Sequence, residues 1–529
     1  MIEKLVLKNF KHFEAEVFSF NSSRNIFIGE NGVGKSSLLE AISLVLSGSY
    51  LRIEKIGINN LFNSKSIEKF CELPVSEREA SNLPYLIVEL HFEKNNPEIS
   101  DNFELCGKVN SERLEAFGIW LKISPNLDDY HNEIQQMLGI ENMIFPFEYY
   151  NVEFKTFSGA QFNSYKKYHK FDFSFIDTSL IDTSKELQKH INDIYDNCIE
   201  PDNRAKINSN FRMISDNFIE EMLKEGIIQN YSEYKLAINN HTSSGFKEKV
   251  TALKNGIDIK NFGQGEKVLL SVANSYKNIN EKTKIILIEE PENHLSHLNM
   301  LKLIKIIENN QNIQLFIATH SGLIASRLDL DKCILISDET NMKLSQLDNE
   351  TVKFFKKSTH SDLLNFILSK KCILVEGNAE YILLNKFYDM ISGSNPMTDN
   401  IDIISVGGLS FKRFLEVAKI LKKKTVVITD NDGDYQKKIE DKYSDYNDDE
   451  NIKITSDDNI VNRTFEICLY NENSDWILRR NITKSKDIQE WMLSNKSESA
   501  FRLLESLESD QTGFKIPEYI KEAVVWIRS

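Results

Sequence analysis

The sequence lacks long apolar runs: in its 529 residues, no window approaches the ~20 consecutive apolar residues that a membrane-spanning helix needs. It also lacks paired cysteines, because its six cysteines are scattered without a C-x-x-C motif. That scatter argues against a zinc site and against a disulfide framework, so we expect reduced thiols. Residues 1–10 alternate like a strand and lack the apolar block and cleavage site of a signal peptide. We therefore expect a cytoplasmic protein that is not exported and has no membrane partner.

Acidic residues outnumber basic ones by 79 to 64, so the formal net charge is −15 at pH 7. This balance argues against a protein that coats nucleic acid, because affinity for phosphate depends on lysine and arginine. It leaves room for a local basic groove. The chain has no internal repeat, heptad seam or low-complexity linker. Its length predicts two to four domains, and 41% apolar with 27% charged residues is typical of a globular protein.

A glycine-rich segment, Gly29–Ser37, has the sequence GENGVGKSS and fits the pattern G-x-x-x-x-G-K-[ST]. It follows an apolar strand, Arg24–Ile28, and precedes an apolar helix, Leu38–Leu46, which is the context that a P-loop requires. Lys35 is expected to reach the β- and γ-phosphate oxygens, and Ser36 to offer its hydroxyl to Mg²⁺. We predict that this segment binds ATP through Glu30, Asn31, Gly32, Val33, Gly34, Lys35, Ser36 and Ser37.

Two acidic residues, Glu289 and Glu290, end an apolar strand, Ile285–Ile288, and resemble a Walker B motif with Glu in place of the usual first Asp. Glu289 is predicted to hold Mg²⁺ through a water, and Glu290 to orient or deprotonate the attacking water. Alone, such a pair is more often the acidic start of a helix. The P-loop in the same chain favours the ATPase interpretation. A later strand, Leu315–Thr319, is followed by His320, whose position resembles that of the switch histidine that senses the γ-phosphate in ATP-binding-cassette enzymes. A lone histidine at such a position is usually structural.

The segment Asn261–Lys267 precedes an apolar helix, Val268–Tyr276, and resembles the signature loop of these cassette ATPases. In that family, the loop of one subunit contacts the γ-phosphate of the ATP bound to the other subunit of a dimer. We therefore predict that Gln264 contributes to nucleotide binding and that the chain forms a homodimer or tetramer. The usual Ser-Gly-Gly is replaced here by the four residues Phe262–Gly265, a departure from the pattern.

The first 180 residues are rich in strand patterns, and the pattern then changes to helical spacing over about residues 184–234. We expect this later stretch to be a helical insert that offers contacts for a dimer. Strands are expected at Leu5–Phe10, Phe18–Phe20, Leu86–Phe92, Phe117–Ile123, Phe147–Phe154 and Phe171–Ile176.

A second group of carboxylates follows in the last third of the chain. The strand Lys371–Val375 ends in Glu376, and the strand Thr425–Thr429 ends in the D-x-D pair Asp430 and Asp432. If both strands belong to one parallel sheet, the three carboxylates meet at its carboxyl edge, where they can bind hard divalent cations. Taken alone, the D-x-D-G segment is about as often a solvated acidic turn.

A cassette ATPase followed by Leu-Val-Glu-Gly and Asp-x-Asp resembles the OLD (overcoming lysogenization defect) family, which joins an ATPase to a Toprim nuclease. The resemblance covers nearly the whole chain and implies an ATP-dependent, Mg²⁺- or Mn²⁺-dependent endonuclease acting on double-stranded DNA. The Gabija nuclease subunit, a phage-defence protein with a partner helicase, is similar in architecture. Anti-phage defence and a helicase encoded nearby are therefore expected. The resemblance also implies metal ligands at Glu376, Glu380, Asp430, Asp432 and Glu466, and a catalytic lysine at Lys496, with Lys486 as a competitor.

These inferences predict an α/β chain with two domains. An ABC-type P-loop ATPase domain is expected over residues 1–365, interrupted by the helical insert, and a Toprim domain over residues 366–529. A topoisomerase or primase is disfavoured because zinc-binding cysteines are missing. The alternative is a RecF-like or SMC-like DNA-binding ATPase without nuclease activity, which leaves Glu376 and the D-x-D pair unexplained.

Overall fold

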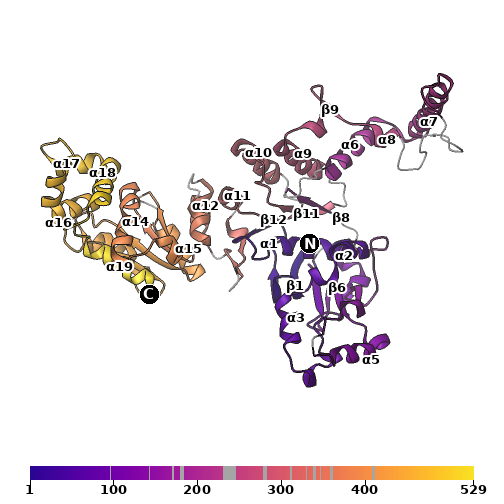
Figure 1. The fold of residues 1–529 in the computed structure, drawn as a ribbon, viewed down its shortest axis with the longest axis horizontal. Helices are drawn as coiled ribbons and strands as arrows, with labels where there is room; N and C mark the ends of the chain where they lie inside the picture. Colours follow the sequence, from indigo (N-terminus) through magenta and orange to yellow (C-terminus); the bar gives the residue numbers. More distant parts are fainter. Residues whose placement is uncertain are drawn as a thin grey trace. The chain divides into compact units, whose positions relative to one another are not determined.

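The computed structural model describes residues 1–95, 97–141, 143–169, 172–178, 184–229, 246–277, 283–309, 313–328, 330–337, 341–345, 347–357, 362–407 and 411–529 (Figure 1). The chain forms two compact units, Met1–Asn25 with Gly34–Thr319, and Ile26–Val33 with His320–Ser529. All six cysteines are free thiols. Within the described ranges, no helix has both the length and the apolar character to cross a bilayer.

The first sheet is antiparallel, with the order β2-β1-β4-β6-β5 and with β7 paired to β6. Buried residues alternate along the middle of β1, at Leu5, Leu7 and Asn9, whereas β4 is buried along nearly its whole length. The expected strand Phe147–Phe154 is only partly right, because a 3₁₀ turn follows Pro146 and the strand begins at Tyr150. The strands of this first sheet are β1 (Ile2–Phe10), β2 (Phe13–Ser19), β4 (Leu86–Phe92), β5 (Cys106–Gly107), β6 (Ala116–Pro125) and β7 (Tyr150–Thr156).

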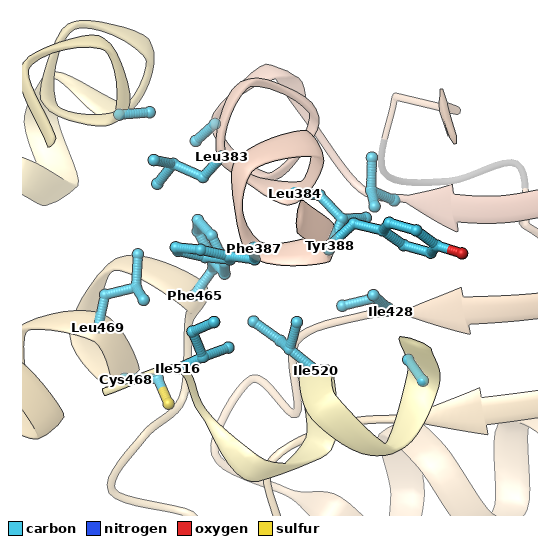
Figure 2. Packing of buried hydrophobic residues seen from close by; sticks show 14 of the residues in the cluster. Leu383, Leu384, Phe387, Tyr388, Ile428, Phe465, Cys468, Leu469, Ile516 and Ile520 are labelled. Carbon is cyan, nitrogen blue, oxygen red and sulfur yellow. The ribbon is translucent and has the colours of Figure 1, made fainter. Parts of the chain in front are cut away.

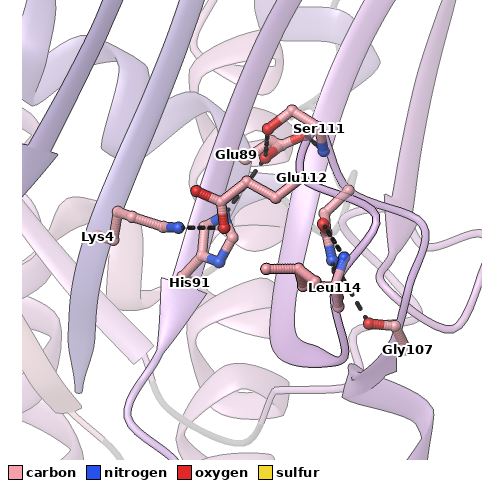
Figure 3. A network of polar contacts seen from close by, with 8 residues as sticks. Lys4, Glu89, His91, Gly107, Ser111, Glu112 and Leu114 are labelled. Atoms are coloured by element: carbon pink, nitrogen blue, oxygen red, sulfur yellow. Dashed lines mark hydrogen bonds and ion pairs between the residues drawn. The ribbon is translucent and has the colours of Figure 1, made fainter.

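A buried polar network fixes one loop to this sheet (Figure 3). Glu89 and His91 lie two residues apart on β4, and each side chain is only 2% exposed. The Glu89 carboxylate accepts hydrogen bonds from the backbone N–H and the hydroxyl of Ser111, at 2.7 and 2.8 Å. At the same loop, the Lys4 ammonium lies 2.8 Å from the Glu112 carboxylate. The buried carboxylate is thus hydrogen-bonded, as a polar group inside a protein requires.

The second sheet carries the P-loop and has the order β14-β13-β3-β12-β11-β8. β8, β11 and β12 run parallel to one another, as do β3 and β13, whereas β14 is antiparallel. Its strands are β3 (Arg24–Ile28), β8 (Asp172–Asp177), β11 (Thr283–Glu289), β12 (Gln314–Ala318), β13 (Cys333–Leu335) and β14 (Met342–Lys343). The helices that lie next to these strands in the sequence include α1 (Lys35–Ser47), α9 (Gln264–Lys277), α10 (His297–Glu308) and α11 (Gly322–Arg327).

Helices α6 (Ser184–Cys198) and α7 (Pro201–Lys224) occupy the stretch predicted to be helical. Residues 230–234, which the prediction included, lie outside the described residues. On α7, Ile214 and Phe218 are 64% and 55% exposed, so this helix presents apolar side chains on its surface. A two-stranded hairpin, β9 (Leu253–Lys254) and β10 (Ile257–Asp258), precedes α9.

The third sheet is fully parallel, with the order β16-β15-β17-β18. Its strands are β15 (Lys371–Val375), β16 (Ile401–Ser405), β17 (Lys424–Ile428) and β18 (Ile452–Thr455). The helices of this region are α12 (Asn349–Lys357), α13 (Asp362–Leu368), α14 (Asn378–Ser392), α15 (Phe411–Leu421), α16 (Phe465–Arg480), α17 (Ile488–Ser494), α18 (Lys496–Ser509) and α19 (Glu518–Arg528).

The core of this region lies between the sheet and its helices (Figure 2). Leu383 and Phe387 of α14 pack in one cluster with Phe465 of α16 and Ile520 of α19, and each is 3% exposed or less. Burying one such side chain is worth roughly 1.5–3 kcal/mol. The core therefore holds the N-termini of α14 and α16 against the carboxyl edge of the sheet, where the predicted metal ligands lie.

Candidate functional site

The P-loop has the backbone that phosphate binding needs. Gly32 and Gly34 have φ values of 84° and 102°, which side-chain-bearing residues rarely adopt. A Cβ at Gly34 would lie 2.7 Å from the Phe13 ring, so only glycine fits there. Helix α1 begins at Lys35 with no side-chain cap and no acidic residue in its first turn, which leaves its N-terminus suited to an anion. Lys35 is buried, at 5% exposed.

The predicted Mg²⁺-holding carboxylate, Glu289, lies at the end of β11. Its neighbours in register are Ala318 on β12 and Asp177 on β8. Burial raises the pKa of Glu289, while a hydrogen bond with Ser36 opposes the shift. The two predicted Mg²⁺ contacts of the nucleotide site therefore touch each other, and Asp177 adds a third oxygen donor beside them.

Glu290 has a left-handed backbone, with φ at 44°, a conformation that is costly for a residue with a side chain and that often marks functional sites. Its N–H donates to the carbonyl of Ala318 at 2.8 Å, and its carboxylate accepts from the Asn293 amide at 2.6 Å. These bonds fix the acidic side chain that was predicted to orient the attacking water. His320 lies two residues after the end of β12.

The predicted signature loop packs against the segment that follows Walker B. A Cβ at Gly265 would lie 2.5 Å from the backbone oxygen of His294, so glycine is required at this contact. Gln264 begins α9 beside it. A cavity of about 800 Å³ lies here, and Gly263, Gln264, Gly265, His294 and Ser296 are among its lining residues.

The carboxyl edge of the third sheet gathers the second predicted site. Glu376 follows β15 directly, and the pairing of β15 with β17 brings it to the edge where Asp430 lies. Asp430 is hydrogen-bonded through Oδ1 to the Phe465 N–H at 2.8 Å, at the start of α16. Burial, together with the charges of Glu380 and Glu376, raises the pKa of Asp430 to about 8. Burial likewise raises the pKa of Glu380 to about 7.

Glu466 is the most deeply buried carboxylate of the group, at 2% exposed. Among the described residues, no hydrogen bond of good geometry reaches either of its oxygens. The Lys496 ammonium, at the first residue of α18, lies 3.3 Å from Glu466 Oε2. Burial lowers the pKa of Lys496, but the charges of Glu466 and Asp430 outweigh it and leave the pKa above its usual range. Lys486 lies instead on the exposed stretch before α17.

Asp432 faces outward, unlike Asp430. Its φ is 51°, and its ammonium partner is Lys438, with Nζ 2.9 Å from Asp432 Oδ2. Between the two aspartates, the buried Asn431 donates to the carbonyls of Asp457 and Asn459 at 2.7 and 3.1 Å. The D-x-D loop is therefore anchored by its middle residue, with one carboxylate directed inward and the other outward.

This chemistry suits a hard divalent cation. All the predicted ligands are carboxylates, and Glu466 offers two buried oxygens that no hydrogen bond of good geometry reaches from the part of the chain described. Burying several carboxylates together is costly unless a cation compensates their charge. Among the described residues, however, no three such side chains already converge at ligating distance. Asp432 is held by Lys438 instead, so cation binding requires at least this side chain to turn.

Sequence reasoning missed two residues at these sites. Asp177 directly follows an expected strand, and its position at a strand end was the available signal. Nothing in the sequence pointed to Lys438, because it lies on a π-helical turn that the sequence pattern does not predict.

The sequence profile of the AAA ATPase domain family matches residues 1–325, more than half of the 529 residues. The chain belongs to this family. A second profile, described as the TOPRIM domain of overcoming lysogenization defect protein-like proteins, matches residues 367–432 of this AAA-family ATPase. The predicted order, a P-loop ATPase domain followed by a Toprim domain of the OLD type, is thereby confirmed.

Two curated relatives span most of this AAA-family ATPase. Endonuclease GajA of Bacillus cereus (strain VD045) is 23% identical over 463 residues, which cover 81% of this chain and 74% of GajA. The Retron Vc95 probable ATPase of Vibrio cholerae serotype O1 biovar El Tor is 24% identical over 446 residues, covering 73% of this chain and 84% of that protein. The solved C-terminal region of the Xanthomonas campestris pv. campestris OLD protein matches 30% of this chain and 92% of its own, at 15% identity and a TM-score of 0.22.

Proposed function

We propose that this protein binds and hydrolyses ATP in its N-terminal domain and uses a divalent-metal site in its Toprim domain to cut double-stranded DNA. The observation that carries the nuclease proposal is Glu466, a buried carboxylate that no hydrogen bond of good geometry reaches within the described ranges and that lies beside Lys496 and near the raised-pKa Asp430. The similarity to Endonuclease GajA supports the same activity. We place the boundary between the two domains at residues 365 and 366.

In the ATPase domain, Lys35 would neutralise phosphate oxygens at the start of α1, and Ser36 with Glu289 would hold Mg²⁺. Glu290, fixed by its bond to Asn293, would orient or deprotonate the water that attacks the γ-phosphate. His320 would sense the γ-phosphate.

In the Toprim domain, the ligands for Mg²⁺ or Mn²⁺ would be Glu376, Glu380, Asp430, Asp432 and Glu466. Bound divalent ions activate the attacking water and stabilise the leaving oxygen in phosphodiester hydrolysis. Lys496 would place a positive charge where negative charge builds up on the phosphate. We favour Lys496 over Lys486 for this role, because Lys496 lies 3.3 Å from Glu466.

We further propose a homodimer or tetramer in which the loop at Gln264 acts on the nucleotide of a second subunit. The apolar residues exposed on α7 support contact between copies, since Ile214 and Phe218 are more than half exposed. We place the protein in the cytoplasm, in anti-phage defence, with a helicase encoded nearby as its partner. The resemblance to the OLD family supports these three proposals.

The deciding experiment is plasmid cleavage by wild type and Asp430→Ala, each with Mg²⁺, Mn²⁺ or a chelator, beside ATP hydrolysis by the same preparations. We expect wild type to cut only with metal, and Asp430→Ala to lose cleavage while it keeps ATP hydrolysis. Cleavage by Asp430→Ala, or cleavage that persists in chelator, would contradict the proposal. The RecF-like or SMC-like DNA-binding ATPase would then be the better account, although it leaves the buried Glu466 unexplained.

A further inference from the structure

Lys438 lies beside the predicted metal ligands at the carboxyl edge of the third sheet. It has no part in the function proposed above. It lies on a π-helical turn, Gln436–Asp441, directly after the D-x-D loop. π-Helical turns are rare and occur often at functional sites. This one returns the Lys438 ammonium to within 2.9 Å of Asp432 Oδ2. Both side chains are about half exposed, at 45% and 52%, so the pair faces solvent.

The backbone of both members of this pair is held by hydrogen bonds. The Asp432 N–H donates to the carbonyl of Arg463 at 3.1 Å, and the buried Asn431 before it is anchored to the segment after β18. On the other side, Asp434 holds the turn, because its side chain accepts from the Lys437 N–H at 3.1 Å and its carbonyl from the Lys438 N–H at 3.0 Å. Hydrogen bonds therefore fix the backbone on both sides of the pair, and the Lys438 side chain spans the distance between them.

Lys438 has a second cation beside it. The ammonium of Lys442, one turn further on, interacts electrostatically with both Glu376 and Asp432. In a chain with a net charge of −15, these two lysines make a local concentration of positive charge near the same carboxylates. Single exposed ion pairs add little stability, so stability alone gives a weak reason for this arrangement. Phosphate binding gives a stronger reason for the arrangement, because the lysine ammonium acts as a point charge and can contact phosphate oxygens from many directions.

We propose that Lys438 binds a backbone phosphate of the DNA strand being cut, and that it is held on Asp432 until a divalent cation takes that carboxylate. The inference rests on the proposed nuclease function and deepens it. A cation shared by several carboxylates outcompetes one ammonium for Asp432, because its charge is double and its other ligands lie at the same edge. Lys438 then loses its partner next to the bound phosphodiester. Metal binding and DNA binding are thereby coupled through one side chain.

The test compares Lys438→Gln with Lys437→Gln in the full-length protein. Lys437 lies on the same turn and is exposed, so its replacement removes the same charge one residue away. Lys438→Arg keeps the charge. The first measurement is Mn²⁺ binding by calorimetry without DNA. We expect Lys438→Gln to bind Mn²⁺ up to about five-fold more tightly than wild type, because a competing ion pair is removed. Lys437→Gln should match wild type.

The second measurement is the affinity for a DNA duplex with Ca²⁺ in place of Mg²⁺, over a series of salt concentrations. For Lys438→Gln we expect the slope of log affinity against log salt to fall by about one, the value for one lost phosphate contact. Lys438→Arg should keep the wild-type slope. Unchanged or weaker Mn²⁺ binding by Lys438→Gln overturns the inference, and so does a salt slope equal to that of Lys437→Gln. If wild type neither binds this duplex nor cuts plasmid with Mg²⁺, the proposed nuclease function itself is wrong and this inference falls with it.

Discussion

Lys496 and Glu466 form an ion pair in which the two partners differ greatly in exposure. The Glu466 side chain is 2% exposed and that of Lys496 is 52% exposed, with 3.3 Å between Nζ and Oε2. The buried carboxylate is thus compensated by a single ammonium from the first turn of α18. The ammonium itself is half exposed, as its proposed role at the phosphate requires.

The first prediction concerns this lysine. Lys496→Ala should slow DNA cleavage on the order of 10²-fold, because the positive charge that would stabilise the transition state is lost. Its carboxylate neighbours remain, so Mn²⁺ binding by calorimetry should persist. Lys486→Ala is the matched control, since Lys486 is exposed and precedes α17. If Lys486→Ala were the variant that lost cleavage, the assignment would have to be reversed.

The P-loop and the strand-end carboxylates Glu289 and Glu376 could be predicted from the sequence, because each lies in a short continuous stretch of the chain. The strand Arg24–Ile28 has the bounds expected, and the helix after the P-loop begins at Lys35, within the motif. The apolar strands before Glu289 and Glu376 are likewise continuous runs bounded by acids. A strand, a turn and a helix in direct succession leave little room for another interpretation.

Other features depend on contacts that only the tertiary structure creates. Asp177 reaches the nucleotide site because β8 pairs in parallel with β11, more than 100 residues later in the chain. Gly265 is required by its approach to the His294 carbonyl, which no spacing rule encodes. Lys438 reaches Asp432 only because the turn after the D-x-D loop is π-helical. Sequence periodicity describes the environment within one element, and these three contacts join different elements or depart from regular geometry.

The second prediction separates ATP binding from ATP hydrolysis. Lys35→Ala should abolish nucleotide binding, because the buried end of the P-loop loses the ammonium that neutralises the phosphates. Glu290→Gln should bind ATP normally and hydrolyse it on the order of 10²-fold more slowly, since the amide cannot accept a proton from water. Filter binding of labelled ATP and phosphate release measure the two steps. Wild-type hydrolysis by Glu290→Gln would show that another group positions the water.

The third prediction uses the contact between Gly265 and His294. Gly265→Val should displace the signature loop, because even a Cβ would lie 2.5 Å from the His294 oxygen. Such overpacking costs roughly 1–3 kcal/mol. We expect ATP binding to be retained and ATP hydrolysis to be lost, together with ATP-dependent self-association measured by light scattering. Gly263→Ala is the control, since nothing lies within 4 Å of a Cβ at that position. Equal hydrolysis by both variants would remove the loop from the ATPase cycle.

The last prediction concerns Lys423, a buried lysine directly before β17. It is 8% exposed, and its ammonium donates to the carbonyl of Ser369. Burial lowers its pKa from 10.5 to about 8. Between these two values the unfolded chain binds more protons than the folded one, so this residue makes stability rise with pH over that window. Below pH 8, the full cost of burying the charge is present.

Lys423→Met should therefore stabilise the protein at pH 7, by roughly 2 kcal/mol once the lost hydrogen bond to the Ser369 carbonyl is subtracted. The advantage should shrink as the pH rises from 8 towards 10.5, because the wild-type lysine is then neutral in the folded state. Urea unfolding at several pH values, compared with the exposed neighbour Lys422→Met, measures both effects. The comparison between variants removes the pH dependence that the raised pKa of Asp430 gives to both. A stability difference that stayed constant across this pH range would mean that Lys423 keeps its ordinary pKa in the folded protein.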